Sequence, residues 1–240
     1  MNIENTELQN STETAIGYIP CYRLPFLSLF HADCMEIMKQ YPDKYFDLAV
    51  VDPPYGIGAG SKKFINGTSK TVKDYYKEND WDTERPTQEF FTELKRVSKN
   101  QIVWGGNYFA DLLGAFRCFI FWDKTIHGNS YADGELAWTS FDGVARYYRK
   151  NIAQVNSEGR MHPTQKPITL YDYVFTNFAS EGDLILDTHF GSGSIALAVD
   201  KANRLDKMNL HLTACEIDKE YIDKAIKRIS ESIKQCTLSF

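Results

Sequence analysis

The chain has 240 residues, of which 43% are hydrophobic and 25% charged, and this suits one sizeable α/β core rather than two independent domains. Its formal net charge of −5 argues against a protein that binds polyanions over its whole surface. The five cysteines show no Cys-x-x-Cys pair and no metal-like spacing with the five histidines, so we expect a reducing compartment and no bound metal. Because the N-terminus lacks a signal-peptide core and no stretch is apolar enough to cross a membrane, we expect a cytoplasmic protein without membrane contact.

Apolar runs alternate with helical patterns along the chain. The runs that predict strands are Leu27–Phe30, Phe46–Val51, Gln101–Trp104, Cys118–Trp122, Leu184–Leu186 and Leu210–Cys215. Apolar residues at helical spacing predict helices over Thr87–Val97, Tyr108–Leu113, Pro167–Phe178, with Pro167 at the first helical position, and Lys219–Ile233. This alternation indicates an α/β fold with a mostly parallel sheet and helices on both faces. We expect a loose tail over residues 1–20 and one domain over residues 21–240.

The tetrapeptide Asp52-Pro53-Pro54-Tyr55 directly follows the apolar run Phe46–Val51. Ligands of α/β proteins bind at the carboxyl ends of such strands. Asp52 offers a fixed acceptor, the carbonyl of Pro53 offers another, neither proline donates an N–H, and Tyr55 can stack. Two acceptors on the N–H bonds of an adenine or cytosine amine would stabilise the positive charge that builds as its nitrogen attacks. The alternative is a turn that merely ends a strand.

A glycine-rich turn follows the apolar run that ends at Asp187, and it leads into a predicted helix start. Such a turn presents free N–H groups to a carboxylate or phosphate, and Glu216, about 20 residues on, can accept hydrogen bonds from two ribose hydroxyls. The turn also fits the G-x-G-x-x-A pattern of nicotinamide and flavin enzymes. Too little chain follows for the rest of a dinucleotide fold, and Asp187 suits an ammonium better than a pyrophosphate. We therefore expect S-adenosylmethionine as cofactor.

Together the two motifs resemble those of the amino-specific DNA methyltransferases, in the circularly permuted arrangement called the β class, where D-P-P-Y precedes the glycine motif. Further stretches similar to that family are Phe30–Cys34, Val103–Tyr108, Phe121–Lys124, Glu135–Ser140 and His162–Pro167. The resemblance covers about residues 27–233. It implies a single Rossmann-like methyltransferase domain with permuted motif order, S-adenosylmethionine as methyl donor and DNA as substrate.

The resemblance also implies a role for each motif residue. Asp52 and the Pro53 carbonyl would hold the amine at a corner stiffened by Pro54, and Tyr55 would stack on a base flipped out of the duplex. The residues implied in cofactor binding are Asp187, Phe190, Gly191, Ser192 and Gly193 at the amino-acid end, Glu216 at the ribose, Asp33 at the adenine amine, and Thr164 and Lys166 at the methionine carboxylate. Asp33 could instead cap a helix that begins at Cys34, and Thr164 and Lys166 could be helix-entry residues.

Two groups of basic residues flank the catalytic half of the chain and are the expected DNA contacts, although solvated surface is the alternative reading. They are Lys62, Lys63 and Lys70 in the loop 56–82, and Arg146 and Arg149 in the short segment 141–161. Larger family members carry a substantial insert where this chain has segment 141–161. Recognition of the DNA sequence must then fall to these two segments or to a partner subunit, which makes a homodimer one option; a cognate restriction enzyme is another expected partner.

Aspartate at the first position of the tetrapeptide favours the N6 amine of adenine, because serine is more usual in the cytosine enzymes of this family. A cytosine-N4 DNA methyltransferase remains an alternative, since its chemistry is nearly the same. A protein-amide methyltransferase, whose tetrapeptide usually begins with asparagine, and a non-catalytic nucleic-acid-binding module are the two others.

Overall fold

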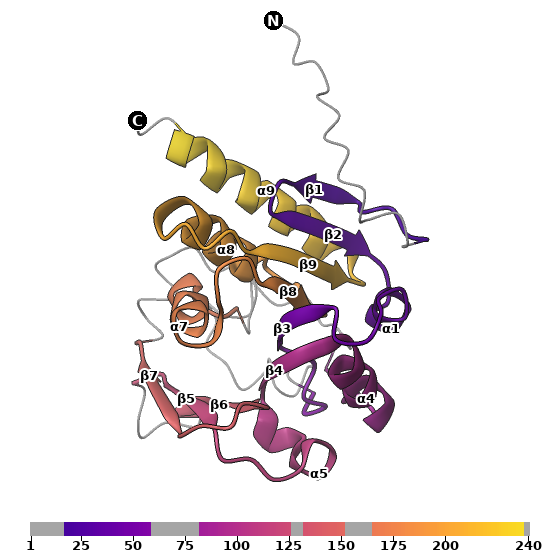
Figure 1. The fold of residues 1–240 in the computed structure, drawn as a ribbon, viewed down its shortest axis with the longest axis vertical. Helices are drawn as coiled ribbons and strands as arrows, with labels where there is room; N and C mark the ends of the chain where they lie inside the picture. The colour runs from indigo at the N-terminus through magenta and orange to yellow at the C-terminus, as the bar shows by residue number, and fades with distance from the viewer. Residues whose placement is uncertain (1–16, 59–81, 126–131, 152–164, 238–240) are drawn as a thin grey trace, which may run out of the picture.

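The computed structural model describes residues 17–58, 82–125, 132–151 and 165–237, and these parts build one nine-stranded sheet between two layers of helices (Figure 1). The strand order is β1-β2-β9-β8-β3-β4-β6-β5-β7. The strands are β1 (Tyr22–Leu24), β2 (Leu27–His31), β3 (Phe46–Val51), β4 (Ser98–Trp104), β5 (Phe119–Asp123), β6 (Gly134–Thr139), β7 (Arg146–Arg149), β8 (Leu184–Asp187) and β9 (His211–Glu216).

The sheet is mostly parallel, as the alternating pattern predicts. Five neighbouring pairs are parallel, β2 with β9, β9 with β8, β8 with β3, β3 with β4 and β5 with β7, and three are antiparallel. Each of the six predicted strands is present, with ends that differ by at most three residues. Strands β1, β6 and β7 were not predicted, because none of them is a continuous apolar run.

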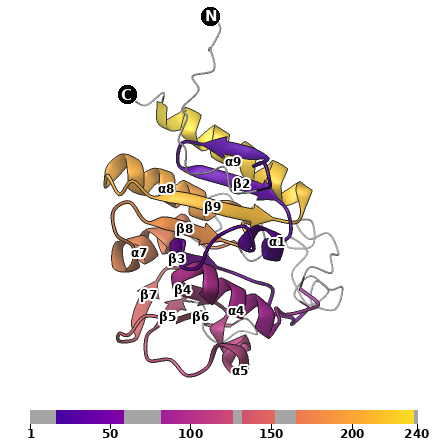
Figure 2. The same cartoon turned by 45° about the vertical axis from the view of Figure 1, so that its right-hand side comes forward.

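Alternate residues of the central strand β3 face the two helical layers. Leu48 and Val50 pack with α7 (Ile168–Phe178), α8 (Ser194–Leu205) and α9 (Lys219–Thr237). On the other face, Ala49 and Val51 pack with α1 (Cys34–Met38), α4 (Gln88–Val97) and α5 (Ala110–Leu113). Figures 1 and 2 show the two groups of helices on opposite sides of the sheet. The predicted fold class, an α/β sheet with helices on both faces, is therefore confirmed.

Two helix predictions need correction. Pro167 is the N-cap of α7 rather than its first helical residue, and Ile168 begins the helix. The helix predicted over Tyr108–Leu113 is divided into the 3-10 turn η1 (Gly106–Tyr108) and α5, because Phe109 leaves the helical conformation between them.

Residues 1–16 of the predicted tail lie outside the described residues, as does most of loop 56–82, so the predicted boundaries of the tail and the domain stay predictions. None of the helices in the described parts of the chain is long and apolar enough to cross a membrane.

The position of β3 between β8 and β4 makes its apolar side chains the centre of the core. We expect Leu48→Ala to lower the free energy of unfolding by about 2–5 kcal/mol, because Leu48 is 1% exposed and the substitution leaves a cavity. Urea unfolding followed by circular dichroism measures this loss. The control is Val144→Ala, because Val144 is 62% exposed and its truncation should change stability by less than about 0.5 kcal/mol. Equal losses in the two variants would contradict this assignment of the core.

Candidate active site

Asp52 lies immediately beyond β3, and both of its carboxylate oxygens are engaged. The Tyr55 hydroxyl donates to Oδ1 at 2.7 Å, and the Lys166 ammonium donates to Oδ2 at 2.5 Å. The Lys166 side chain is 1% exposed and that of Asp52 19% exposed. Two residues of the tetrapeptide are thus joined to a lysine more than a hundred residues away in the sequence.

Lys166 continues into a chain of buried ion pairs. Its Nζ lies 3.1 Å from Oε2 of Glu135 on β6, and Oε1 of Glu135 lies 2.5 Å from Nζ of Lys124. The four groups therefore alternate in charge along the chain Asp52, Lys166, Glu135, Lys124. Neither Glu135 nor Lys124 was among the predicted site residues, although both fall within stretches that resemble the family. Their mutual contact depends on the antiparallel pairing of β5 with β6, which was not predicted.

Burial and ion pairing act against each other in this chain of charges. Burial raises the pKa of Asp52, and the Lys166 ammonium partly opposes that rise. Burial would also raise the pKa of Glu135, but Lys166 and Lys124 hold it at about 2. Burial would lower the pKa of Lys166, and the Asp52 and Glu135 carboxylates reverse this and raise it. Lys166 and Glu135 are therefore both charged at neutral pH.

The backbone and ring of Tyr55 are held from three sides. Its ring stacks on Tyr108, with centroids 4.9 Å apart and planes 15° from parallel. Its backbone N–H and that of Gly56 donate to Oδ1 of the buried Asp82, at 2.6 and 2.9 Å. Gly105, at φ 70°, lies against the ring so closely that a Cβ there would come within 2.2 Å of a ring carbon. Asp82 and Tyr108 were not predicted, since nothing in the local sequence ties them to the tetrapeptide.

The glycine-rich turn between β8 and α8 faces the end of β9. Glu216 accepts hydrogen bonds from the backbone N–H of Gly191 at 2.8 Å on Oε2, and from Ile217 and Asp218 at 2.9 and 3.0 Å on Oε1. Gly193, at φ 70°, is the N-cap of α8. The turn and the acidic residue predicted to work with it are thus in direct contact.

Asp187 is a buried carboxylate at the end of β8. It accepts a hydrogen bond from the His189 backbone N–H at 3.0 Å and has no ion-pair partner within the described parts of the chain. Burial, aided by the charge of Asp52, raises its pKa to about 8. A cation placed beside Asp187 would favour the ionised form, so this site suits a ligand that carries one.

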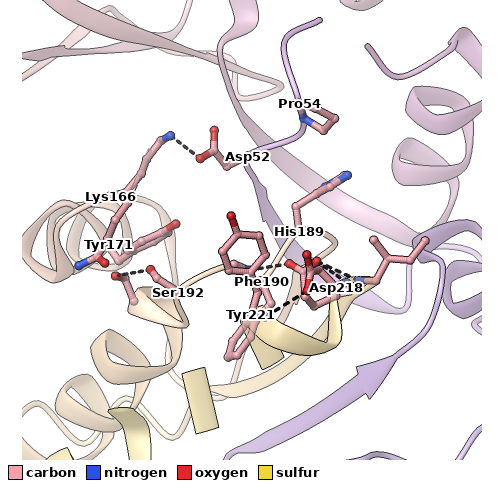
Figure 3. A pocket seen from close by; sticks show the side chains of 14 residues that line it. Asp52, Pro54, Lys166, Tyr171, His189, Phe190, Ser192, Asp218 and Tyr221 are labelled. Carbon is pink, nitrogen blue, oxygen red and sulfur yellow. Dashed lines mark hydrogen bonds and ion pairs between the residues drawn. The ribbon is translucent and has the colours of Figure 1, made fainter. Parts of the chain in front are cut away.

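A cavity of about 310 Å³ connects the tetrapeptide to the glycine-rich turn. Its wall includes Asp52 and Pro54 from the end of β3, Lys166 and Tyr171 from the α7 region, Phe190, Gly191, Ser192 and Ser194 from the turn and α8, and Glu216, Ile217, Asp218 and Tyr221 beyond β9. Figure 3 shows the Lys166 to Asp52 contact at one end, with Phe190, Ser192 and Tyr221 at the other. The carboxyl ends of three parallel strands, β3, β8 and β9, therefore open on one space.

The remaining predicted cofactor residues are placed differently. Oδ1 of Asp33 accepts a hydrogen bond from Met35 N–H at 2.7 Å, so Asp33 caps α1, which is the alternative reading of the sequence. Lys166 lies in the cavity wall but directs its ammonium to Asp52 and Glu135. Thr164 lies outside the described residues.

Of the predicted DNA contacts, Arg146 and Arg149 stand exposed at the two ends of β7, the edge strand. Strand β4 runs parallel to β3, two successive antiparallel pairings give β5 the direction of β4, and β7 runs parallel to β5. Arg149 therefore lies on the side of the sheet where the carboxyl ends of these strands emerge, which is also the side of Asp52. Nε of Arg149 is 3.2 Å from Oδ2 of Asp123. Lys62, Lys63 and Lys70 lie outside the described residues.

Comparison with known proteins links this geometry to a family. A family model described as DNA methylase matches residues 103–227. The type II methyltransferase M.HpaI of Haemophilus parainfluenzae is 25% identical, over an alignment that covers 87% of this chain and 79% of that protein. The type II methyltransferase M.BglII of Bacillus subtilis is 22% identical, with 84% and 68% covered.

Solved structures share the fold. The complex of M1.HpyAVI with SAM matches with a TM-score of 0.53 and 20% identity, and the alignment covers 84% of this chain and 99% of that one. The cytosine-N4-specific PvuII DNA methyltransferase matches with a TM-score of 0.57 and 14% identity, over 88% and 89% of the two chains.

The contact of Gly105 with the Tyr55 ring can be tested by adding one methyl group. We expect Gly105→Ala to lower the free energy of unfolding by about 1–3 kcal/mol more than Gly182→Ala does, because only the former forces a side chain into a filled space. Gly182 is a matched control, since it also has a positive φ, 82°, and no atom lies within 4 Å of the position that a Cβ would take there. Urea unfolding measures both losses, and equal values would mean that Tyr55 does not pack against Gly105.

Proposed function

The chain belongs to the family of N6-adenine and N4-cytosine DNA methylases, and we propose that it transfers a methyl group from S-adenosylmethionine to the N6 amine of adenine in DNA. The observation that carries the proposal is the shared cavity. Asp52 at the end of β3, the glycine-rich turn after β8 and Glu216 at the end of β9 all border it, so an acceptor base and a donor can meet there.

The acceptor side of the site is the tetrapeptide. Asp52 accepts an N–H of the base amine and stabilises the positive charge that develops on nitrogen, and the Pro53 carbonyl offers a second acceptor. In the structure, Oδ1 of Asp52 is taken by the Tyr55 hydroxyl. That hydroxyl yields Oδ1 to the amine, and the Tyr55 ring is then available to stack on the base. Such contacts offset the few kcal/mol needed to take a base out of the duplex.

The cofactor side fits S-adenosylmethionine by its chemistry. When bound, this cofactor supplies a methyl group activated by a sulfonium. Asp187, a buried carboxylate whose pKa burial raises to about 8, suits the ammonium of the methionine end. Glu216, already fixed by three backbone N–H groups, suits the ribose hydroxyls, and Phe190, Gly191, Ser192 and Gly193 shape the turn between the two. Asp33 keeps its proposed place at the adenine amine and Thr164 at the methionine carboxylate. Lys166 can frame that carboxylate only as part of the cavity wall, because its ammonium is held by Asp52 and Glu135.

DNA contacts are proposed at the edge of the sheet that carries the cavity. Arg149 lies at that edge, where it can meet a phosphate. Arg146 lies at the other end of the same strand and remains a proposed contact because it is exposed. The loop 56–82 with Lys62, Lys63 and Lys70, and the segment 141–161, are the proposed recognition segments. A second copy of the chain and a cognate restriction enzyme remain proposed partners.

Removing the Asp52 carboxylate tests the acceptor role. We expect Asp52→Ala to reduce the single-turnover rate of methyl transfer by at least about 10²–10³-fold, because the developing charge loses its acceptor. Its affinity for S-adenosylmethionine in calorimetric titration should remain close to that of the wild type. Asp43→Ala, which removes an exposed carboxylate paired with Arg96, is the control and should keep full activity. If Asp52→Ala turns over at the wild-type rate, the tetrapeptide is only a turn at the end of a strand and has no catalytic role. If the wild type does not bind S-adenosylmethionine, the proposed enzymatic function is wrong.

The identity of the methylated base is a separate question, because adenine and cytosine amines need the same acceptors. We expect DNA from cells that express the protein to contain N6-methyladenine in a fixed sequence context. Nucleoside analysis by mass spectrometry identifies the product, and single-molecule sequencing locates it. N4-methylcytosine without N6-methyladenine would overturn the choice of adenine while leaving the methyltransferase assignment intact.

A further inference from the structure

The buried row of charges Lys124, Glu135 and Lys166 ends on Asp52, the proposed acceptor. We propose that Lys166, held in place by Glu135, is a positioning residue for methyl transfer: it stays on Oδ2 of Asp52, keeps that carboxylate ionised and leaves Oδ1 as the oxygen that receives the base amine. This role rests on the proposed function of Asp52. It adds Lys166 and Glu135 to the residues that support methyl transfer and names Oδ1, rather than Oδ2, as the oxygen that accepts the base amine.

The geometry fixes Lys166 more firmly than a lysine side chain is usually fixed. Its Nζ has carboxylates on two sides, Oδ2 of Asp52 at 2.5 Å and Oε2 of Glu135 at 3.1 Å. It also lies 5.4 Å from the centre of the Trp104 ring, within cation–π range. Its side chain is 1% exposed, and Pro167 next to it is the N-cap of α7. The ammonium therefore cannot leave Oδ2 without losing several contacts at once.

The two partners of Asp52 differ in how easily they can be replaced. The Tyr55 hydroxyl on Oδ1 is a neutral donor, whereas Lys166 on Oδ2 is a charged donor in a buried ion pair. Both hydrogen bonds are charge-assisted because the carboxylate is ionised, but the Lys166 bond also carries the attraction between two full opposite charges in a buried site. An incoming amine therefore displaces Tyr55 rather than Lys166, and Oδ1 becomes the acceptor.

Glu135 gives Lys166 a second counter-charge. A lone cation beside Asp52 would oppose the positive charge that develops on the attacking amine. Because the charge of Lys166 is shared with Glu135, less of it acts on the amine, while the ammonium still keeps its place on Oδ2. Lys124 completes the balance by pairing with Oε1 of Glu135, so that Asp52 and Glu135 each have a cation beside them.

The groups that face Asp52 come from several elements, and within the described parts of the chain one of them is a cation. They are Lys166 before α7, Glu135 on β6, Tyr55 after β3, Tyr171 on α7 and Asp187 at the end of β8. Lys166 lowers the pKa of Asp52 and Glu135 raises it, and the effect of Lys166 is the larger. Without Lys166 the pKa of Asp52 would therefore be higher, and over a wider pH range its carboxyl group would be protonated and less able to accept a hydrogen bond from the amine.

The first test is the pH dependence of single-turnover methyl transfer on DNA in Lys166→Met. We expect the acidic limb of the profile to move to higher pH, since a close opposite charge shifts a carboxyl pKa by about 1–3 units. At a pH below the shifted limb the rate of methyl transfer should fall by about tenfold or more, and in alkaline buffer the rate should recover. Lys166→Arg keeps the cation and should restore the acidic limb. Lys201→Met, which removes a half-exposed lysine paired with Asp172, should leave the profile unchanged.

The second test needs no activity. In Lys166→Met, Asp52 and Glu135 both lose the Lys166 cation. The double variant Lys166→Met with Glu135→Gln is therefore used, because Asp52 is then the carboxylate that has lost its cation. A raised folded-state pKa means that the folded protein binds an extra proton, so stability is lost as pH rises through that pKa. Glu135→Gln alone is the reference, because the loss of Glu135, whose pKa is about 2, changes the pH dependence of stability by itself. We expect the Tm of the double variant to fall further below that of Glu135→Gln as pH rises from acidic to alkaline, in thermal unfolding at constant ionic strength.

The outcomes separate the proposals. A wild-type protein that methylates no DNA would contradict the proposed function, whatever the variants do. An active wild type whose profile is the same in Lys166→Met, or a Tm difference that does not change with pH, would overturn the role of Lys166. If Lys166→Met does not fold, the pH profile of methyl transfer is measured in the double variant and in Lys166→Arg instead. A profile in the double variant that matches the wild type would likewise overturn the proposal.

Discussion

A carboxylate taken out of water stays ionised only if it is paired, and the pairing of Asp52 with Lys166 is the contact on which the site depends. The pair brings together the end of the central strand β3 and the segment that leads into α7, while Glu135 adds β6 on the antiparallel side of the sheet. Breaking a buried pair by removing one partner typically costs about 3–5 kcal/mol, because the remaining charge is left uncompensated. Loss of either partner would therefore destabilise the fold, and the same contact sets the charge of the proposed acceptor.

Parallel pairing explains why the order of the motifs along the chain does not matter to the site. Strands β3, β8 and β9 run in one direction, so residues that follow them emerge at one edge. The tetrapeptide precedes the glycine-rich turn by more than a hundred residues, yet both line the same cavity because β3 and β8 are neighbours in the sheet. A permuted chain can thus build the same site as long as the sheet order is kept.

The sequence predicted those parts of the structure that depend on local pattern. Continuous apolar runs located β3, β8 and β9, and with them Asp52, Asp187 and Glu216 at the sheet edge. Strand β7 was missed because its sequence, Arg-Tyr-Tyr-Arg, is exposed and has no apolar run. The partners of Lys166 could not be predicted, since Asp52 lies 114 residues away and no periodicity records such a contact. Asp33 shows a different difficulty, because its local sequence fitted both a helix cap and a contact to the cofactor, and only the structure shows the cap.

The two hydrogen bonds of Asp52 also explain how a buried acceptor can wait for a substrate. An unsatisfied buried carboxylate oxygen would be costly, and the Tyr55 hydroxyl satisfies Oδ1 in the absence of a base. In the proposed reaction the base amine would take that oxygen, so that one hydrogen bond to Asp52 would replace another. The main costs of base entry would then be unstacking the base and separating the Tyr55 ring from that of Tyr108. The ring freed from Tyr108 can then stack on the base. Under this proposal Tyr55 would have two successive partners, and the hydrogen bond from its backbone N–H to Asp82 would hold its backbone in place through the exchange.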